Sequence, residues 1–148
     1  MANPDSVGQF YLDSFGQGRI ASIKATALNT SGNAAITIPL LGGGLTAGNA
    51  TSNSGQVIIR RITVCNPSGS VSSANVSIST TSDGANLITA NTVLSSVSGA
   101  VTFQDIAITG GNVAVSGYNS QALFVNVNTA SGNDNTVDIR VYGDVVSF

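Results

Sequence analysis

The chain has no histidine, no glutamate and no tryptophan, and it has a single cysteine and a single lysine. An active site needs a base, a nucleophile or a metal set in a pocket, and here only aspartates could act as general bases. A serine nucleophile needs such a base within hydrogen-bond reach, yet the many serines fall in turns or on polar strand faces. We therefore expect no enzyme, with no catalytic residue and no cofactor.

Charge is also scarce. Charged residues make up 8% of the chain, against about 25% in ordinary globular domains. The formal net charge is -2 and the five basic residues are scattered, so no basic stripe is available for nucleic-acid phosphates. The surface must consist largely of Ser, Thr, Asn and Gly, which suits a protein that packs against copies or neighbours.

Targeting and membrane signals are missing from the sequence. The N-terminus, MANPDSVGQF, has neither a basic nor an apolar signal-peptide region. No apolar run approaches the roughly 18 residues of a membrane span. We expect a chain that folds in a cytoplasm, without a membrane partner. Cys65, alone in the sequence, rules out an internal disulfide and favours a small buried hydrophobe.

The most β-branched stretch is Gln56 to Asn66, QVIIRRITVCN, which predicts a central strand. Arg60 and Arg61 interrupt it. Consecutive residues point to opposite faces, so one arginine should face inward unless a bulge redirects it. We predict an ion pair with Asp105 or Asp138, and prefer this to an anion or phosphate site.

Other segments alternate between apolar and polar residues with the period of a strand. They cover residues 19–28, 35–41, 71–81, 87–94, 101–108, 121–128 and 137–142. Pro39 makes 35–41 an edge strand. The pattern predicts an all-β sandwich or jelly roll of about eight antiparallel strands, and the turn spacing fits jelly-roll and immunoglobulin-like topologies equally. The predicted core comprises Ile62, Val64, Val76, Ile78, Leu123, Val125, Ile139 and Val141.

Residues 1–18 differ from the single sandwich domain predicted for 19–148. They carry Phe10, Tyr11 and Phe15 among glycines, with no period of a helix or strand. We predict a partner-binding arm anchored by these three aromatics, because aromatic side chains are enriched at interfaces. The alternative is a first strand whose aromatics fill the domain's own core.

The best metal candidate is the run Asn133, Asp134 and Asn135 with Asp138, since carboxylates and amides along a turn can bind calcium. It lacks the glycine and the distal glutamate of an EF-hand loop. Asn-Asp-Asn is also ordinary turn chemistry. We prefer the turn and expect no metal.

Three stretches carry a resemblance to a known family: ITVCNPSGSVSSANVSIST from Ile62, SDGANLIT from Ser82 and ALFVNVNTASGNDNTVDIRVYGDV from Ala122. From Ile62 onward the chain resembles the head decoration, or cement, proteins of tailed bacteriophages. The resemblance implies a β-sandwich subunit in the virion that binds the outside of a capsid and braces neighbouring capsid proteins. It implies the major capsid protein and further copies of the chain as partners, and no catalytic residues.

Two other functions stay open. One is a carbohydrate-binding or host-attachment module, against which the small number of aromatics and the missing tryptophan argue. The other is a shell-forming capsid or fibre subunit, which would assemble into particles by itself.

Overall fold

The computed structural model describes residues 11–12, 18–39, 55–109, 117–118 and 122–147. These residues form ten strands and no helix, so none of them belongs to a helix that could cross a membrane. The strands are β1 (Tyr11–Leu12), β2 (Gly18–Ala27), β3 (Gly32–Pro39), β4 (Gly55–Cys65), β5 (Asn75–Ser79), β6 (Thr92–Val93), β7 (Gln104–Ile106), β8 (Gly117–Tyr118), β9 (Ala122–Thr129) and β10 (Thr136–Ser147).

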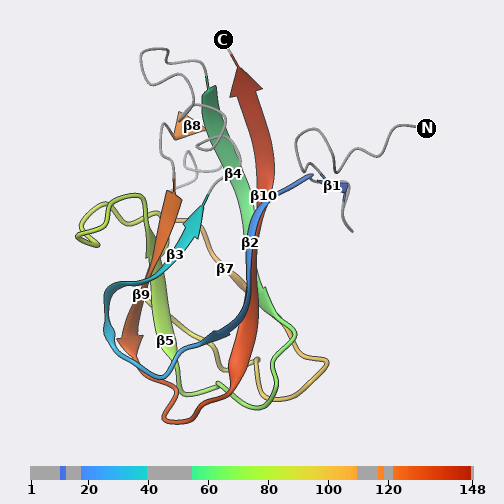
Figure 1. Cartoon of the computed structure of the whole chain (residues 1–148), viewed down its shortest axis with the longest axis vertical. Helices are drawn as coiled ribbons and strands as arrows, with labels where there is room; N and C mark the ends of the chain where they lie inside the picture. Colours follow the sequence, from blue (N-terminus) through green and yellow to red (C-terminus); the bar gives the residue numbers. More distant parts are fainter. Residues whose placement is uncertain (1–10, 13–17, 40–54, 110–116, 119–121, 148) are drawn as a thin grey trace.

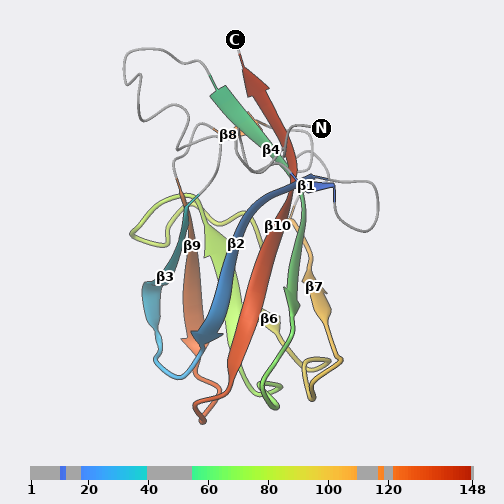
Figure 2. The same ribbon diagram turned by 45° about the vertical axis from the view of Figure 1, so that its right-hand side comes forward.

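Two antiparallel sheets face each other. The larger has the order β1-β2-β10-β4-β7, with β8 also paired to β4, and the smaller has the order β3-β9-β5-β6. Figure 1 separates the two layers, with β3, β9 and β5 on the left and β2, β10 and β4 on the right. Figure 2 shows β2, β10, β4 and β7 side by side in the larger sheet. The predicted all-β sandwich is confirmed.

The pairing of the strands is nested. If β1 and β8 are set aside, the first strand pairs with the last (β2 with β10), the second with the next to last (β3 with β9), and β4 and β5 with β7 and β6. A long antiparallel ribbon wound into a sandwich produces this order, which is that of the eight-stranded jelly roll. The structure therefore selects the jelly roll over the immunoglobulin-like alternative.

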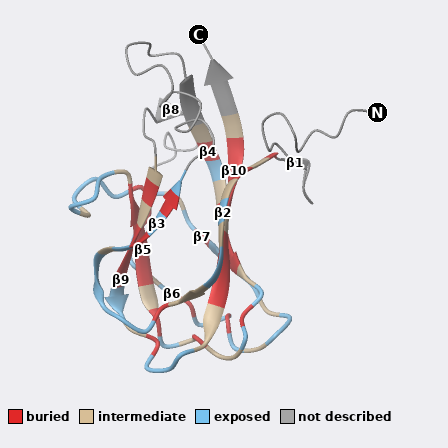
Figure 3. Ribbon diagram, in the orientation of Figure 1, coloured by how far each residue is buried: buried red, intermediate tan, exposed pale blue. Residues whose placement is uncertain are grey.

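The core lies between the sheets. All eight residues predicted for it are fully buried, with 0% exposure, and Figure 3 shows buried residues running along β5, β9 and β10. On β4 and β10 the inward residues alternate with outward ones. Their β-branched side chains thus fill the space between two pleated surfaces, the environment that favours this residue type.

The edges of the sheets follow the sequence only in part. β3 pairs with β9 alone, so the edge position predicted from Pro39 is confirmed. On β2 the predicted alternation ends early. A register shift opposite Asp138 leaves Ala25 exposed with a φ of 50°, where an inward residue was expected. Asp138 Oδ1 accepts a hydrogen bond from the Ala25 N–H at 2.9 Å and so holds this bulge.

Three predicted strands are shorter than expected. The segment 71–81 forms a strand only over β5, and 87–94 only over β6, with isolated bridges at Leu87 and Thr89. The segment 101–108 forms only β7, because a turn at residues 99–101 precedes it. A further short apolar piece at residues 113–115 lies outside the described residues.

Candidate functional site

The outer face of the larger sheet carries a row of functional side chains. Ile62 and Val64 of β4 enter the core, so Arg61, Thr63 and Cys65 point away from it. The same alternation on β10 turns Arg140 and Tyr142 outward. The two strands pair so that Tyr142 faces Arg61 and Arg140 faces Thr63. The pleat thus gathers two guanidinium groups and the buried Tyr142 side chain, which is 4% exposed, on the outer side of the sheet.

A bulge explains how two adjacent arginines fit into this strand. The register with β10 passes from Tyr142 opposite Arg61 to Gly143 opposite Ile59, which leaves Arg60 as the extra residue. Ile59 and Ile62 are both fully buried, and neither arginine enters the core between them. The sequence predicted that one of the two arginines would face inward unless a bulge redirected it. The bulge is present, so neither arginine faces the core.

Both arginines are paired with aspartates. Arg61 Nε donates to Asp105 Oδ1 at 2.9 Å, which confirms the predicted pair, and Thr63 Oγ1 donates to the same oxygen at 2.6 Å. Arg60 Nε donates to Asp144 Oδ2 at 2.7 Å, a partner that the sequence did not suggest. The register shift brings Asp144 opposite Ile58 and so beside the bulged residue.

Asp138, the other predicted partner, holds a different set of groups. Its Oδ2 lies 3.8 Å from Arg140 Nη2 and accepts from Asn66 Nδ2 at 3.2 Å, and Oδ1 takes the Ala25 N–H. The carboxylate is buried. A buried charge needs such partners, so Asp138 ties β2, β10 and the end of β4 together.

A turn held by hydrogen bonds of Thr102 lies beside the outward side chains of β4 and β10. The Thr102 hydroxyl accepts from the N–H groups of Ser98 and Gly99 at 3.0 and 3.1 Å and donates to the Gly99 carbonyl at 2.6 Å. These hydrogen bonds hold a turn where the sequence predicted the start of a strand. The turn exposes two apolar side chains to water. Val101 is 94% exposed and Phe103 is 56% exposed. We call residues 100–103 the apolar tip.

The apolar tip and the strands border an open hollow of about 460 Å³. Its polar lining comes from Arg61, Thr63, Asn66, Thr102 and Arg140. Its apolar lining comes from Ala100, Val101, Phe103, Cys65 and Tyr142. We call this space the outer-face hollow. It combines hydrogen-bonding groups with aliphatic and aromatic surface, as small-molecule sites do.

Two of the chain's few charged residues, Arg61 and Arg140, line the outer-face hollow, and each is paired with an aspartate. The chain has five basic and seven acidic residues, and four of these twelve are Arg61, Arg140 and the aspartates that pair with them. The outward position of Arg140 follows from the alternation along β10, whereas that of Arg61 depends on the bulge at Arg60. The approach of the apolar tip could not be read from the sequence, because it depends on how a turn distant in sequence packs.

Cys65 departs from the sequence prediction. It was expected to be a small buried residue, but it is half-buried and lines the outer-face hollow. The reason is the alternation along β4: because Val64 faces the core, the next residue, Cys65, faces the opposite side of the sheet. The expectation of a buried cysteine is wrong.

Of the three aromatics predicted as partner-binding anchors, only Tyr11 belongs to the described residues. Phe10 and Phe15 are outside the described residues. Tyr11 belongs to β1, where its backbone pairs with Arg19, and Arg19 pairs in turn with Tyr142. β1 therefore joins the sheet that carries the outer-face hollow, and the role of the three aromatics as anchors remains a prediction.

The candidate metal turn is occupied by hydrogen bonds within the protein. Asn133 Nδ2 and Asn135 Nδ2 both donate to the Ser70 carbonyl at 3.0 Å. Asp134 Oδ1 accepts from Asn29 Nδ2 at 2.8 Å. These contacts tie neighbouring loops together. Among the described residues no group of three or more His, Cys, Asp or Glu side chains is placed to hold a metal ion.

Comparison with known proteins adds no relative: no family model, no curated protein and no solved structure matches this chain.

Proposed function

We propose that this protein is a structural virion component, a decoration or cement subunit that binds the outside of a phage head. The observation that carries the proposal is the nested pairing of β2 to β10, the jelly roll that viral capsid domains use. Lectins and cupins also use it, so the fold supplies an analogy. The resemblance of residues 62–148 to phage cement proteins is the reason why we propose a capsid protein rather than a lectin or a cupin.

The surface agrees with such a role. A chain with 8% charged residues has little means of electrostatic steering, so its contacts with the major capsid protein and with further copies are apolar and hydroxyl-mediated. The arm supplies the anchors Phe10, Tyr11 and Phe15. The subunit folds in the host cytoplasm and works on the virion surface as a brace rather than as an enzyme.

The test adds the purified protein to heads assembled from the major capsid protein of the virus that encodes it. We expect the protein to cosediment with the heads, to raise their resistance to heat, and to remain bound at high salt. Substitution of Phe10, Tyr11 and Phe15 by serine in the full chain should abolish cosedimentation with little change in melting temperature.

Two results contradict the proposal. If the protein leaves the heads unoccupied at every salt concentration, it is not a decoration subunit. If the purified chain closes into particles by itself, it is a shell-forming subunit. Unfolding of the serine variant would assign the aromatics to the domain's own core and remove the arm from the binding model.

A further inference from the structure

We infer that the outer-face hollow receives the apolar tip of a second copy of this chain, so that two copies exchange tips in a symmetric dimer. The inference deepens the proposed function, on which its role in the virion rests, because that function names further copies as partners without giving them a surface. It is carried by the exposure of the apolar tip, by the engaged polar groups of the outer-face hollow and by the charge balance of the strands that carry them.

The apolar tip exposes side chains that the core of the domain does not use. The connection between β6 and β7 buries Leu94 and Val97 completely, whereas Val101 is 94% exposed and Phe103 is 56% exposed. The buried pair therefore anchors this connection in the core, and the exposed pair lies outside it. Exposed apolar side chains that lie next to one another, rather than singly, mark interaction sites.

Hydrogen bonds fix the shape of the apolar tip before any partner arrives. The Thr102 N–H and hydroxyl both donate to the Gly99 carbonyl, at 2.9 and 2.6 Å. The Gln104 side chain accepts from the Ser96 N–H at 2.9 Å and donates to the Val93 carbonyl at 2.8 Å, which ties the connection to β6. A segment held in this way loses little conformational entropy when it is bound.

The polar groups that line the outer-face hollow are engaged within the protein. Arg61 Nε and Thr63 Oγ1 both donate to Asp105 Oδ1, at 2.9 and 2.6 Å. Asn66 Nδ2 donates to Asp138 Oδ2 at 3.2 Å. An apolar side chain that enters the hollow breaks none of these hydrogen bonds, whereas a polar ligand would have to compete with them. The hollow therefore suits an apolar occupant.

The outer-face hollow also has the size and the apolar surface for such an occupant. Its volume is about 460 Å³, and a closed apolar cavity of about 150 Å³ is enough to bind benzene. It therefore has room for the side chains of Val101 and Phe103 from a second copy. Beyond the apolar tip itself, Cys65 and Tyr142 contribute the apolar part of the lining.

The adjacency of the apolar tip and the outer-face hollow is the reason to choose a second copy as the partner. The residues of the tip themselves line one side of the hollow, so projection and recess lie next to each other. A contact with two-fold symmetry uses the same patch on both subunits. A two-fold axis between tip and hollow places each tip over the hollow of the other copy and buries both tips at once. A different protein would need a separate complement for each feature.

The charge balance of β4, β7 and β10 lets two identical surfaces meet. These strands carry three arginines and three aspartates, and each arginine is paired with one of the aspartates: Arg60 with Asp144, Arg61 with Asp105 and Arg140 with Asp138. A surface with charges of one sign would repel its own copy. Here the charges of the three strands cancel, so two copies approach without such repulsion.

Sedimentation velocity of the full-length chain over a concentration series tests the tip exchange. A contact made by two tips and two hollows lies at the small end of specific interfaces, so we expect a dimer that dissociates on dilution. Val101→Ser and Phe103→Ser should each weaken the dimer about tenfold or more. Because both side chains are exposed, these variants should melt like the parent.

Cys65 provides a second measurement that needs no variant, because it is the only cysteine of the chain and lines the outer-face hollow. The tip of a second copy covers it. Alkylation by N-ethylmaleimide should slow about tenfold where dimers make up about nine-tenths of the chain, since the reaction then proceeds through the monomer. Conversely, the alkylated chain should lose the ability to dimerise, because the added group occupies the hollow.

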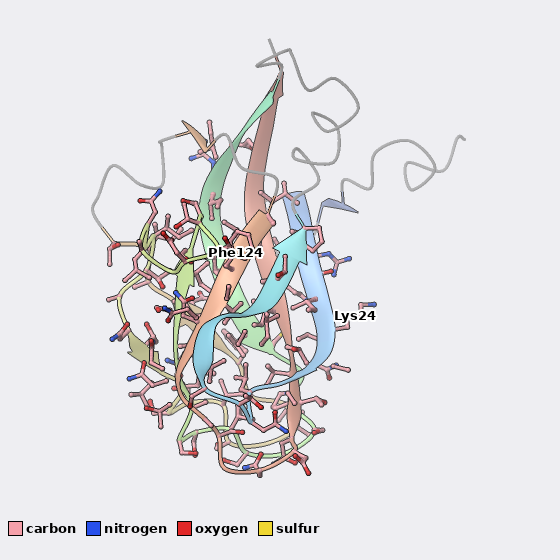
Figure 4. The ribbon with its side chains drawn as sticks, turned by 60° about the vertical axis from the view of Figure 1, so that its left-hand side comes forward. Lys24 and Phe124 are labelled. Atoms are coloured by element: carbon pink, nitrogen blue, oxygen red, sulfur yellow. The ribbon has the colours of Figure 1, made fainter. Side chains whose placement is uncertain are left out.

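Matched controls lie in the smaller sheet, which does not carry the outer-face hollow. Leu87 is 44% exposed and forms a bridge with Ser79. Figure 4 shows Phe124 on β9, where it is half-buried. Leu87→Ser removes an exposed aliphatic side chain and Phe124→Ser an aromatic ring, as the two tip variants do, and both controls should dimerise like the parent.

Three results overturn the inference: the parent sediments as anything other than a monomer and a dimer in exchange, the two tip variants dimerise like the parent, or the alkylation rate of Cys65 is the same at every concentration. Cosedimentation with heads separates the inference from the proposed function. If the parent stays monomeric and the tip variants lose head binding, the apolar tip contacts the capsid protein instead. If the parent dimerises as expected but leaves the heads unoccupied, the tip exchange stands and the decoration function fails.

Discussion

Asp105 Oδ1 receives two hydrogen bonds, from Arg61 Nε at 2.9 Å and from Thr63 Oγ1 at 2.6 Å. The carboxylate belongs to β7 and its donors to β4, so the contact joins two neighbouring strands on the outer face of the larger sheet. The Arg61 side chain is 16% exposed and that of Asp105 is 47% exposed. The pair therefore lies between the surface and buried regimes.

This intermediate exposure sets how much stability the protein should lose when the Arg61–Asp105 pair is broken. Asp105→Ala should lower the free energy of unfolding by about 1 to 2 kcal/mol, because it removes a partly screened ion pair and a hydrogen bond. The Arg60–Asp144 pair, 40% and 48% exposed, serves as the control. Arg60→Ala should cost less than about 1 kcal/mol. Urea unfolding measures both, and equal costs would show that the Arg61 pair is superficial.

Gly143 occupies a position where backbone approaches backbone. A Cβ built there would collide with the carbonyl oxygen of Ile58, at the bulge that accommodates Arg60. Gly143→Ala should destabilise the fold by about 1 to 3 kcal/mol or more, since a backbone atom cannot move aside as a flexible side chain can. Gly32→Ala is the control, because nothing lies within 4 Å of its added Cβ. Thermal melts that coincide for both variants would contradict the collision.

Two alanines adopt the left-handed conformation: Ala25 has a φ of 50° and Ala34 a φ of 48°. Both lie at bulges, and the bulged N–H donates a hydrogen bond to a side chain of the neighbouring strand. The acceptor is Asp138 for Ala25 and Asn126 for Ala34. This conformation costs an L-residue about 1 to 2 kcal/mol. Ala25→Gly and Ala34→Gly should therefore stabilise the protein, by about 0.5 kcal/mol after the greater chain entropy of glycine is counted.

The control for these two substitutions is Ala27→Gly. Ala27 ends β2 without a positive φ, so glycine there should destabilise the fold by about 0.5 to 1 kcal/mol. Differential scanning calorimetry compares the three variants. A lower melting temperature for Ala25→Gly and Ala34→Gly would show that the bulges carry no strain.

Asp83 provides a pH-dependent contact in the turn after β5. The Thr81 hydroxyl donates to its Oδ1 at 2.6 Å and the Ala85 N–H at 2.9 Å, and these bonds lower the pKa of the Asp83 carboxyl from 3.8. A lowered pKa means that the stabilisation is fully present above the unfolded value and is lost as the pH falls through the folded value.

An NMR titration of the Asp83 carboxyl should therefore have its midpoint below 3.8, with the Ala85 amide signal moving at the same pH. Thr81→Val removes the largest cause and should raise the midpoint toward 3.8, whereas Thr92→Val in β6 should leave it unchanged. A parent midpoint at or above 3.8 would mean that the hydrogen bonds do not form in solution.

The sequence indicated much of the outer-face hollow's chemistry but not its shape. The adjacency of Arg60 and Arg61 inside an apolar strand predicted an ion pair with Asp105 or Asp138, and the structure shows the pair between Arg61 and Asp105. The Asp144 partner of Arg60 was missed, because a bulge shifts the register by one residue and no local pattern announces it. The apolar tip was predicted as strand, since the alternation of Val101 and Phe103 continues into β7. Only the hydrogen bonds of Thr102 show that the chain turns there.

The sequence by itself determined the class of the fold and its core. Apolar residues at every second position, most of them β-branched, can bury one face of a strand, so the eight predicted core residues followed from local periodicity. The tertiary structure decided the winding. Whether β2 pairs with β10 or with β3 depends on contacts between residues more than 100 positions apart, such as Ala25 with Asp138, and these leave no periodic trace in either segment. The same long-range packing, rather than any motif, brought the apolar tip over Arg61 and Tyr142 and so created the outer-face hollow.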